Sequence, residues 1–160
     1  MKQPAQRTAG LRPAYWRDAG APFIVVHSLA HAVAAFGAAA ESGREIVIVS
    51  APNAGIYAGP GWFGALVATA REAVPAVQAT ALLDCGDDAG AVLGAIRAGI
   101  EGIVFTGRAD VTARLADIAG QHGASLLTTR PEPALDLGAL FFADSETLRR
   151  RCADLLASLA

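Results

Sequence analysis

Five short apolar runs, each set between segments of helical pattern, constrain the fold of this 160-residue chain more than any other feature. The runs occupy residues 23–27, 45–50, 77–85, 102–106 and 124–129. Continuous apolar runs of this length are typical of strands buried on both faces of a parallel sheet. Because parallel neighbours need a crossover between them, the alternation predicts repeated βα units and a mainly parallel sheet.

The segments between the runs carry helix-end signals. Ser28 caps a helix that extends to about Glu41, and Gly43 ends it. The pattern predicts further helices over residues 62–73, from Asp87 or Asp88 to Gly99, from Asp110 to Gln121 and over residues 145–158, with a sixth strand in the apolar segment 139–143. The predicted fold class is α/β with five or six mainly parallel strands. A three-layer open sheet of the flavodoxin type is slightly favoured over a truncated TIM barrel.

Size and composition indicate a single ordered domain over residues 22–160, preceded by a polar arm at residues 1–21. The net charge is −2 and the basic residues are scattered, which argues against nucleic acid as a partner. No apolar run reaches the roughly 18 residues of a membrane span, and no secretory signal is recognised. The two cysteines, Cys85 and Cys152, make no disulfide framework, so we expect a cytoplasmic protein.

Three candidate catalytic residues lie at predicted strand ends. His27 ends the first strand, and Asp84 and Cys85 end the third. In a sheet of order 2-1-3-4-5 these strands are neighbours, so the three side chains would meet and could activate a thiolate or hold a metal. The alternative is a histidine bonded to backbone and an inert buried cysteine. His31 follows His27 by four residues, but the change from strand to helix between them removes the alignment of a metal-binding pair.

The predicted substrate contacts lie in the second strand, the loop after it and the fourth strand. They are Ser50, Asn53, Gly55 and Thr106. The loop over residues 51–61 is rich in Gly and Pro and leads into a helix, whose free backbone N–H groups can bind an anion. A plain wide turn is an equal alternative. Nearby aromatic side chains, such as Trp62, would line a pocket or bury a subunit contact.

Four pieces of the chain, in order and spacing, resemble the first half of class II fructose-bisphosphate aldolases. They are residues 31–41, residues 46–50 with 54–59, the Leu-Leu-Asp-Cys-Gly of residues 82–86, and residues 95–99 with 102–107, and the likeness covers about residues 29–130. The resemblance implies that Asp84 transfers a proton and that Ser50 helps to bind substrate. Cys85 stands where the family has a zinc-binding histidine.

The departures from that family predict a degenerate site. A complete barrel needs roughly 250 residues, so the strands that carry the other zinc ligands are missing, and residues 128–131 replace an acidic pair. We therefore expect a domain that does not catalyse aldol cleavage, and that binds a small phosphorylated or oxygenated metabolite or serves in assembly. The alternative is a metal-independent or Cys/Asp-dependent lyase acting on a small carbonyl or sugar-phosphate compound.

Two further expectations concern cofactor and partner. One Cys and one His leave a tetrahedral zinc site two protein ligands short, so no cofactor is predicted. A fragment of a barrel has two bare sheet edges and an exposed apolar interior. We therefore predict a homodimer, with the aromatic pairs at residues 62–63 and 141–142 as candidate contacts.

Overall fold

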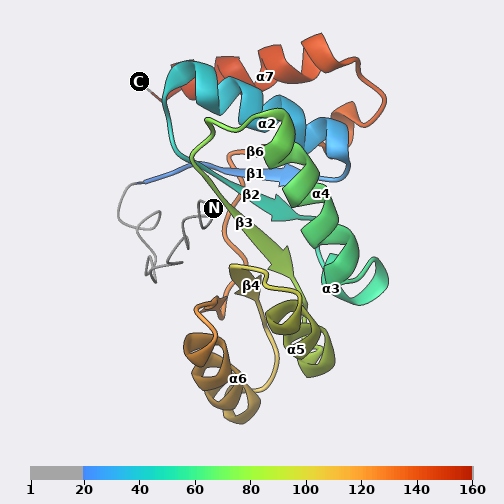
Figure 1. Ribbon diagram of the computed structural model, residues 1–160, viewed down its shortest axis with the longest axis vertical. Coiled ribbons are helices and arrows are strands. Elements are labelled where there is room, and N and C mark those ends of the chain that lie inside the picture. Colours follow the sequence, from blue (N-terminus) through green and yellow to red (C-terminus); the bar gives the residue numbers. More distant parts are fainter. Residues whose placement is uncertain (1–19, 160) are drawn as a thin grey trace, which may run out of the picture.

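The computed structural model describes residues 20–159, which form one six-stranded parallel sheet with helices packed on it (Figure 1). The strands are β1 (Phe23–Val26), β2 (Ile46–Ser50), β3 (Ala79–Asp84), β4 (Gly102–Val104), β5 (Ser125–Leu127) and β6 (Leu135–Asp136). Their order across the sheet is β5-β4-β3-β2-β1-β6, and every pair is parallel. The prediction of an α/β fold with an open, parallel sheet of five or six strands is confirmed.

The helices lie between the strands as the end signals predict. They are α2 (Leu29–Ser42), α3 (Ala54–Tyr57), α4 (Pro60–Ala73), α5 (Ala89–Arg97), α6 (Ala109–Gln121), the 3-10 helix η1 (Leu137–Leu140) and α7 (Ser145–Ser158). The Ser28 side chain accepts a hydrogen bond from the His31 N–H, and Gly43 ends α2 with φ of 67°. Asp88 caps α5. None of these helices is long and apolar enough to cross a bilayer.

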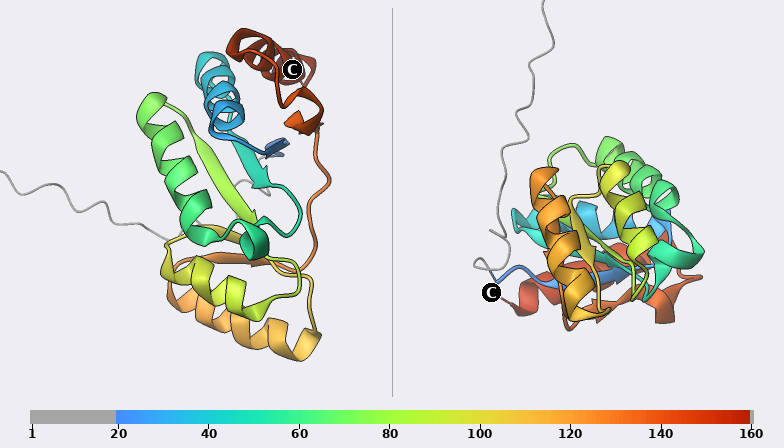
Figure 2. Two further views of the ribbon diagram at one scale, coloured as in Figure 1. Left: turned by 90° about the vertical axis from the view of Figure 1, so that its right-hand side faces the viewer. Right: turned by 90° about the horizontal axis from the view of Figure 1, so that it is seen from below.

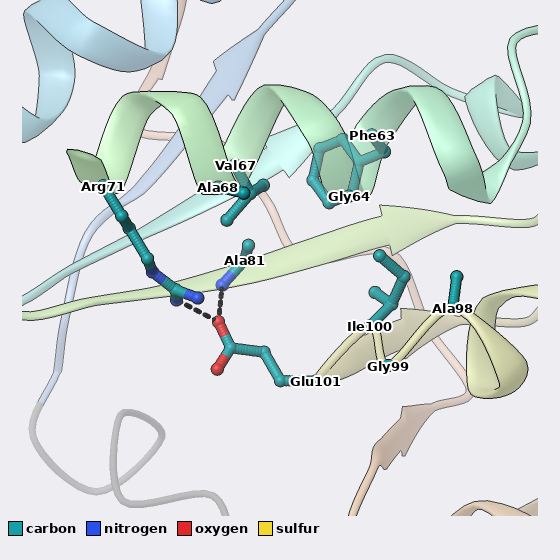
Figure 3. Close-up of a pocket in the computed structure, with 10 residues that line it drawn as sticks. All are labelled: Phe63, Gly64, Val67, Ala68, Arg71, Ala81, Ala98, Gly99, Ile100 and Glu101. Atoms are coloured by element: carbon teal, nitrogen blue, oxygen red, sulfur yellow. Dashed lines mark hydrogen bonds and ion pairs between the residues drawn. The ribbon is translucent and has the colours of Figure 1, made fainter. Parts of the chain in front are cut away.

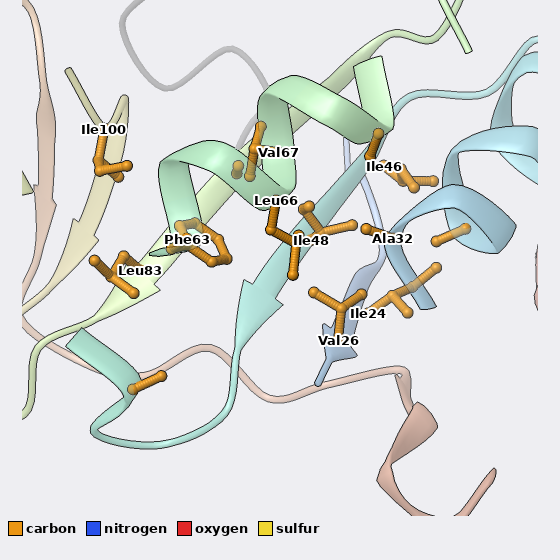
Figure 4. Close-up of a cluster of buried hydrophobic side chains, with 14 of the residues drawn as sticks. Ile24, Val26, Ala32, Ile46, Ile48, Phe63, Leu66, Val67, Leu83 and Ile100 are labelled. Carbon is orange, nitrogen blue, oxygen red and sulfur yellow. The ribbon is translucent and has the colours of Figure 1, made fainter. Parts of the chain in front are cut away.

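The five long helices pack on one face of the sheet. Their buried apolar side chains all belong to one cluster, which includes Ala32 of α2 and Phe63 of α4 (Figure 4). The second cluster, on the opposite face, is built from Val47, Leu82 and other strand residues and contains no helix residue. Strands in sequential order with all crossovers of one hand produce this one-sided cover, as in a stretch of a (β/α) barrel that does not close.

The sheet order differs from the 2-1-3-4-5 order that would have placed the first and third strands side by side. In the structure β2 lies between β1 and β3, because each successive crossover moves one strand further in the same direction. After β5 the chain returns and adds β6 to the free edge of β1. In the left view of Figure 2, this returning segment runs along the side of the sheet away from the helices.

Two local predictions are wrong, one for the place of the sixth strand and one for the cap of α6. The apolar segment 139–143 is not a strand: the sixth strand comes earlier, at Leu135–Asp136, and the apolar segment begins within η1. The Asp136 side chain accepts the Gly138 N–H and so turns the chain into η1.

Asp110 does not cap α6, which begins one residue earlier, after Arg108. The Asp110 carboxylate instead accepts two hydrogen bonds from the Arg108 guanidinium. The predicted arm, apart from Gly20 and Ala21, lies outside the described residues.

Candidate functional site

Asp84 ends β3 and is buried, with 4% of its surface exposed. One carboxylate oxygen, Oδ1, accepts the N–H groups of Asn53 at 3.2 Å and Gly86 at 2.9 Å. The other, Oδ2, accepts from the Arg130 guanidinium at 2.7 Å. Both oxygens of the predicted proton-transferring group therefore already hold donors from the chain itself.

Arg130 reaches this carboxylate from the segment that connects β5 to β6. Its second guanidinium nitrogen donates to the backbone oxygen of Ser50 at 2.9 Å, so the side chain ties β2 to β3 across the carboxyl edge of the sheet. The Asp84 carboxylate is 6% exposed and the Arg130 side chain 24%, which makes this the most buried ion pair among the described residues. A buried carboxylate needs such a partner, because removing one charge of the pair would strand the other.

Cys85 follows Asp84 but faces the helices. Its side chain is fully buried, and the backbone of Gly55 packs so closely that a Cβ atom there would lie 2.6 Å from the Cys85 Sγ. Burial, together with the smaller effects of the nearby charges of Asp84 and Asp88, raises the pKa of Cys85 to about 12. The thiol is therefore protonated at neutral pH, which corresponds to the predicted alternative of an inert buried cysteine.

The four predicted substrate contacts make contacts within the chain at the carboxyl end of the sheet. The Ser50 hydroxyl accepts the Asp84 N–H at 2.9 Å. Asn53 adopts a left-handed conformation, with φ of 61°, that presents its N–H to Asp84, so the loop predicted to bind an anion binds the chain's own carboxylate. Gly55 gives room to Cys85, and Thr106 donates its backbone N–H to the Gly86 oxygen at 2.7 Å.

His27 stands apart from Asp84 and pairs with a residue that the sequence analysis missed. Its Nε2 atom lies 2.7 Å from Oδ1 of Asp136, which ends β6, the strand beside β1. Burial alone would raise the pKa of Asp136, but the Gly138 N–H, the hydrogen bond and charge of His27, and the charge of Arg130 together hold it below its ordinary value of 3.8. Asp136 is thus ionised at neutral pH.

His31 lies beneath this pair in the first turn of α2. Its Nδ1 atom accepts the His27 N–H at 3.1 Å, and its ring stands edge-on to the rings of His27 and Phe141. The residue is fully buried, and its Nε2 atom has no hydrogen-bond partner of ordinary geometry. Burial lowers the pKa of His31 below its ordinary value of 6.5, and the charge that His27 can carry lowers it further; the Leu140 backbone and Asp136 act in the opposite direction.

The described surface is hollowed in at least three places. The smallest, about 140 Å³, lies between α4 and the start of β4, where the Glu101 carboxylate accepts from Arg71 at 2.5 Å and from the Ala81 N–H at 2.8 Å (Figure 3). The second, about 400 Å³, is lined by His27 and Trp62, and the third, about 380 Å³, by Leu140 and Arg151. Parallel sheets bind their ligands at the carboxyl ends of the strands. Of these three hollows, the second and third lie at that end and the first does not.

No group of three or more His, Cys, Asp or Glu within residues 20–159 is arranged to hold a metal ion. His27 and Cys85, the two ligand types expected at the zinc position, belong to strands that β2 separates. The prediction that the protein holds no stoichiometric zinc therefore still rests on the count of ligands, and metal analysis is its test.

Comparison with known proteins assigns the chain to no family. No protein-family model matches the chain, and no match is found among curated proteins. These searches neither support nor contradict the resemblance to class II aldolases.

Proposed function

We propose that the chain is an assembly domain with a class II aldolase-like scaffold, that it does not catalyse aldol cleavage, and that it forms a homodimer. The observation that carries the proposal is that both carboxylate oxygens of Asp84 already accept hydrogen bonds from the chain. A carboxylate that transfers a proton needs a free oxygen within reach of the substrate. Both oxygens of Asp84 hold internal donors, and one is an arginine.

The same end of the molecule carries an apolar surface that a small-molecule enzyme does not require. Six large hydrophobic side chains with at least 41% exposure follow the carboxyl ends of the strands: Leu29, Ile56, Tyr57, Trp62, Phe141 and Phe142. Phe142 is 97% exposed. Exposed aromatic side chains gathered at one end favour a protein contact.

A projecting side chain and a groove lie next to each other at this end. Phe142 projects beyond η1, and the hollow of about 380 Å³ beside it is lined by Leu135, Leu140 and Arg151. In a two-fold contact the same patch is used by both subunits, so Phe142 of each copy would enter the groove of its partner. The lining also includes Ala139 and Arg150, together with the polar side chains of Asp136, Thr147 and Asp154. Its aliphatic side chains and its two arginines suit an aromatic ring, through apolar burial and a cation–π contact.

Light scattering coupled to size exclusion tests the assembly. We expect twice the chain mass of 16.3 kDa for the parent protein, and the mass of one chain for Phe142→Glu and for Ala139→Trp, which fills the groove. Leu159→Glu is the control, because Leu159 is also 48% exposed but lies at the carboxyl end of α7, away from Phe142. Its backbone oxygen there accepts a hydrogen bond from Arg44. A parent protein that stays at one chain mass at all concentrations contradicts the dimer.

A second measurement tests the absence of aldol chemistry. The protein is incubated with fructose 1,6-bisphosphate, with and without added zinc, and triose phosphate release is followed. We expect no release above background in either condition, because Asp84 has no free oxygen. Zinc-dependent release that Asp84→Asn abolishes would overturn the proposal and restore the lyase alternative.

A further inference from the structure

The ion pair of His27 and Asp136 is a different site from Asp84 and has the elements of an acid–base pair. Asp136 is ionised and accepts at 2.7 Å, so the His27 proton belongs on Nε2. In the neutral form of this tautomer, Nδ1 carries the lone pair. No hydrogen bond to this nitrogen is made by any described residue.

The surrounding backbone fixes the ring in place. Gly138 lies so close that a Cβ atom there would stand 2.8 Å from the His27 Nε2 and 3.0 Å from the Asp136 carboxylate. The His31 ring also packs on His27, at 83° between the ring planes and with 5.9 Å between centroids. A histidine whose tautomer and orientation are both set by neighbours is arranged to act on a ligand.

A hollow of about 400 Å³ adjoins this histidine. His27 lines it together with Ser28 and Thr69, which bring hydroxyl groups, and with Leu29, Trp62 and Leu66, which bring apolar walls. Trp62 is 41% exposed. No Lys, Arg, Asp or Glu side chain is among its described lining residues, and the one titratable side chain there, His27, already pairs with Asp136. The hollow therefore suits an uncharged ligand better than a phosphate or carboxylate.

We propose that this hollow is a binding site for an uncharged, ring-containing small molecule that bears a hydroxyl group. The hydroxyl donates to Nδ1 of His27, and the ring lies against Trp62. Asp136 is a positioning residue, because it holds the proton on Nε2. Leu29 and Trp62 also belong to the exposed apolar surface, but no residue of this hollow lines the groove proposed to receive Phe142, so the site does not require the proposed dimer.

The probe for the test is 4-fluorophenol, followed by fluorine NMR on the full chain. We expect saturable binding, and at least a 10-fold weaker dissociation constant for 4-fluoroanisole, which has the same ring without a donor. Phenyl phosphate should not compete. This comparison changes only the ligand, so it holds even where a protein variant fails to fold.

Variants then assign the two contacts. His27→Phe and Trp62→Ala should each weaken 4-fluorophenol binding at least 10-fold, whereas His122→Gln, at the end of α6, should leave it unchanged. Asp136→Asn should shift the proton between the His27 ring nitrogens, which nitrogen NMR of the ring detects directly. Equal binding of phenol and anisole, or binding unaffected by His27→Phe in a folded protein, would overturn the proposal.

Discussion

At the scale of single residues, the Arg130–Asp84 pair is the contact whose loss should matter most. Replacing Arg130 by methionine leaves a buried carboxylate with two N–H donors but no opposite charge. We expect a loss of about 3 kcal/mol in the free energy of unfolding, measured by urea denaturation. Arg108→Met is the matched control, because the Arg108–Asp110 pair is exposed at 80% and 59% and should contribute little. Similar losses for both variants would contradict the structural role of Arg130.

His31 should make stability depend on pH. Its pKa is lowered in the folded protein, so the unfolded chain takes up a proton near pH 6.5 while folded His31 stays neutral. The free energy of unfolding should therefore fall as the pH decreases through about 6.5, and stay level above it. The lowered pKa of Asp136 acts only near and below its ordinary value of 3.8, outside this window. Denaturation between pH 7.5 and 5.5 should show the slope reduced in His31→Gln but not in His122→Gln.

Both thiols should be unreactive in the native protein. Burial raises the pKa of Cys85 to about 12 and that of Cys152 to about 11, so neither forms a thiolate at neutral pH. We expect Ellman's reagent to titrate no thiol rapidly in native protein and both in denaturant, since the chain has 2 cysteines. Rapid reaction of one native thiol that Cys85→Ala removes would return Cys85 to the list of candidate nucleophiles.

At the scale of elements, the short helix α3 sits against the end of β3 with almost no room. A Cβ atom on Gly55 would lie 2.6 Å from the Cys85 Sγ and 3.0 Å from the backbone oxygen of Asp84. Gly55→Ala should therefore destabilise the protein by about 1–3 kcal/mol in thermal or urea unfolding. Gly61→Ala, in the first turn of α4 with nothing within 4 Å, should be neutral or slightly stabilising. Equal effects would mean that the α3 contact is not tight.

Local signals in the sequence predicted most elements, because their causes are local. The Ser28 cap, the Gly43 turn and the bounds of the last helix depend on a few adjacent residues. The strand order could not be obtained this way, since the same apolar runs suit crossovers in one direction or in both. Asp136 escaped for a related reason: it lies 109 residues from His27, and the apolar run after it suggested a strand in the wrong place.

The candidate site was only partly predictable. The sequence correctly indicated that Ser50 and Asp84 lie at one edge, and the structure joins them by a hydrogen bond of 2.9 Å. It did not reveal that Arg130 pairs with the Asp84 carboxylate, because the two residues are 46 positions apart and the contact depends on the path of the connection from β5 to β6. An unpaired arginine after a strand, opposite a buried aspartate, is the one signal that could have suggested the pair.

At the scale of the whole molecule, the sequential sheet leaves β6 and α7 to return to the start of the domain. α7 packs on α2 in the most extensive helix–helix contact of the described residues. Deleting residues 145–160 should therefore uncover the alanine-rich face of α2 and yield a protein that binds a hydrophobic dye and unfolds without cooperativity. A truncated chain with an unchanged, cooperative thermal transition would contradict this dependence.

The return of α7 to α2 also sets an order of events during synthesis. As the chain leaves the ribosome, β1 to β5 appear in the order in which they pair, so each strand finds its neighbour already made. α2 meets β1, β2 and α4 early, but the face that α7 covers has no such partner, because residues 43–144 must be translated before α7 begins. The nascent chain therefore carries one uncovered apolar face of α2 for most of its elongation, and a chaperone that recognises such a face should bind it until translation passes residue 158.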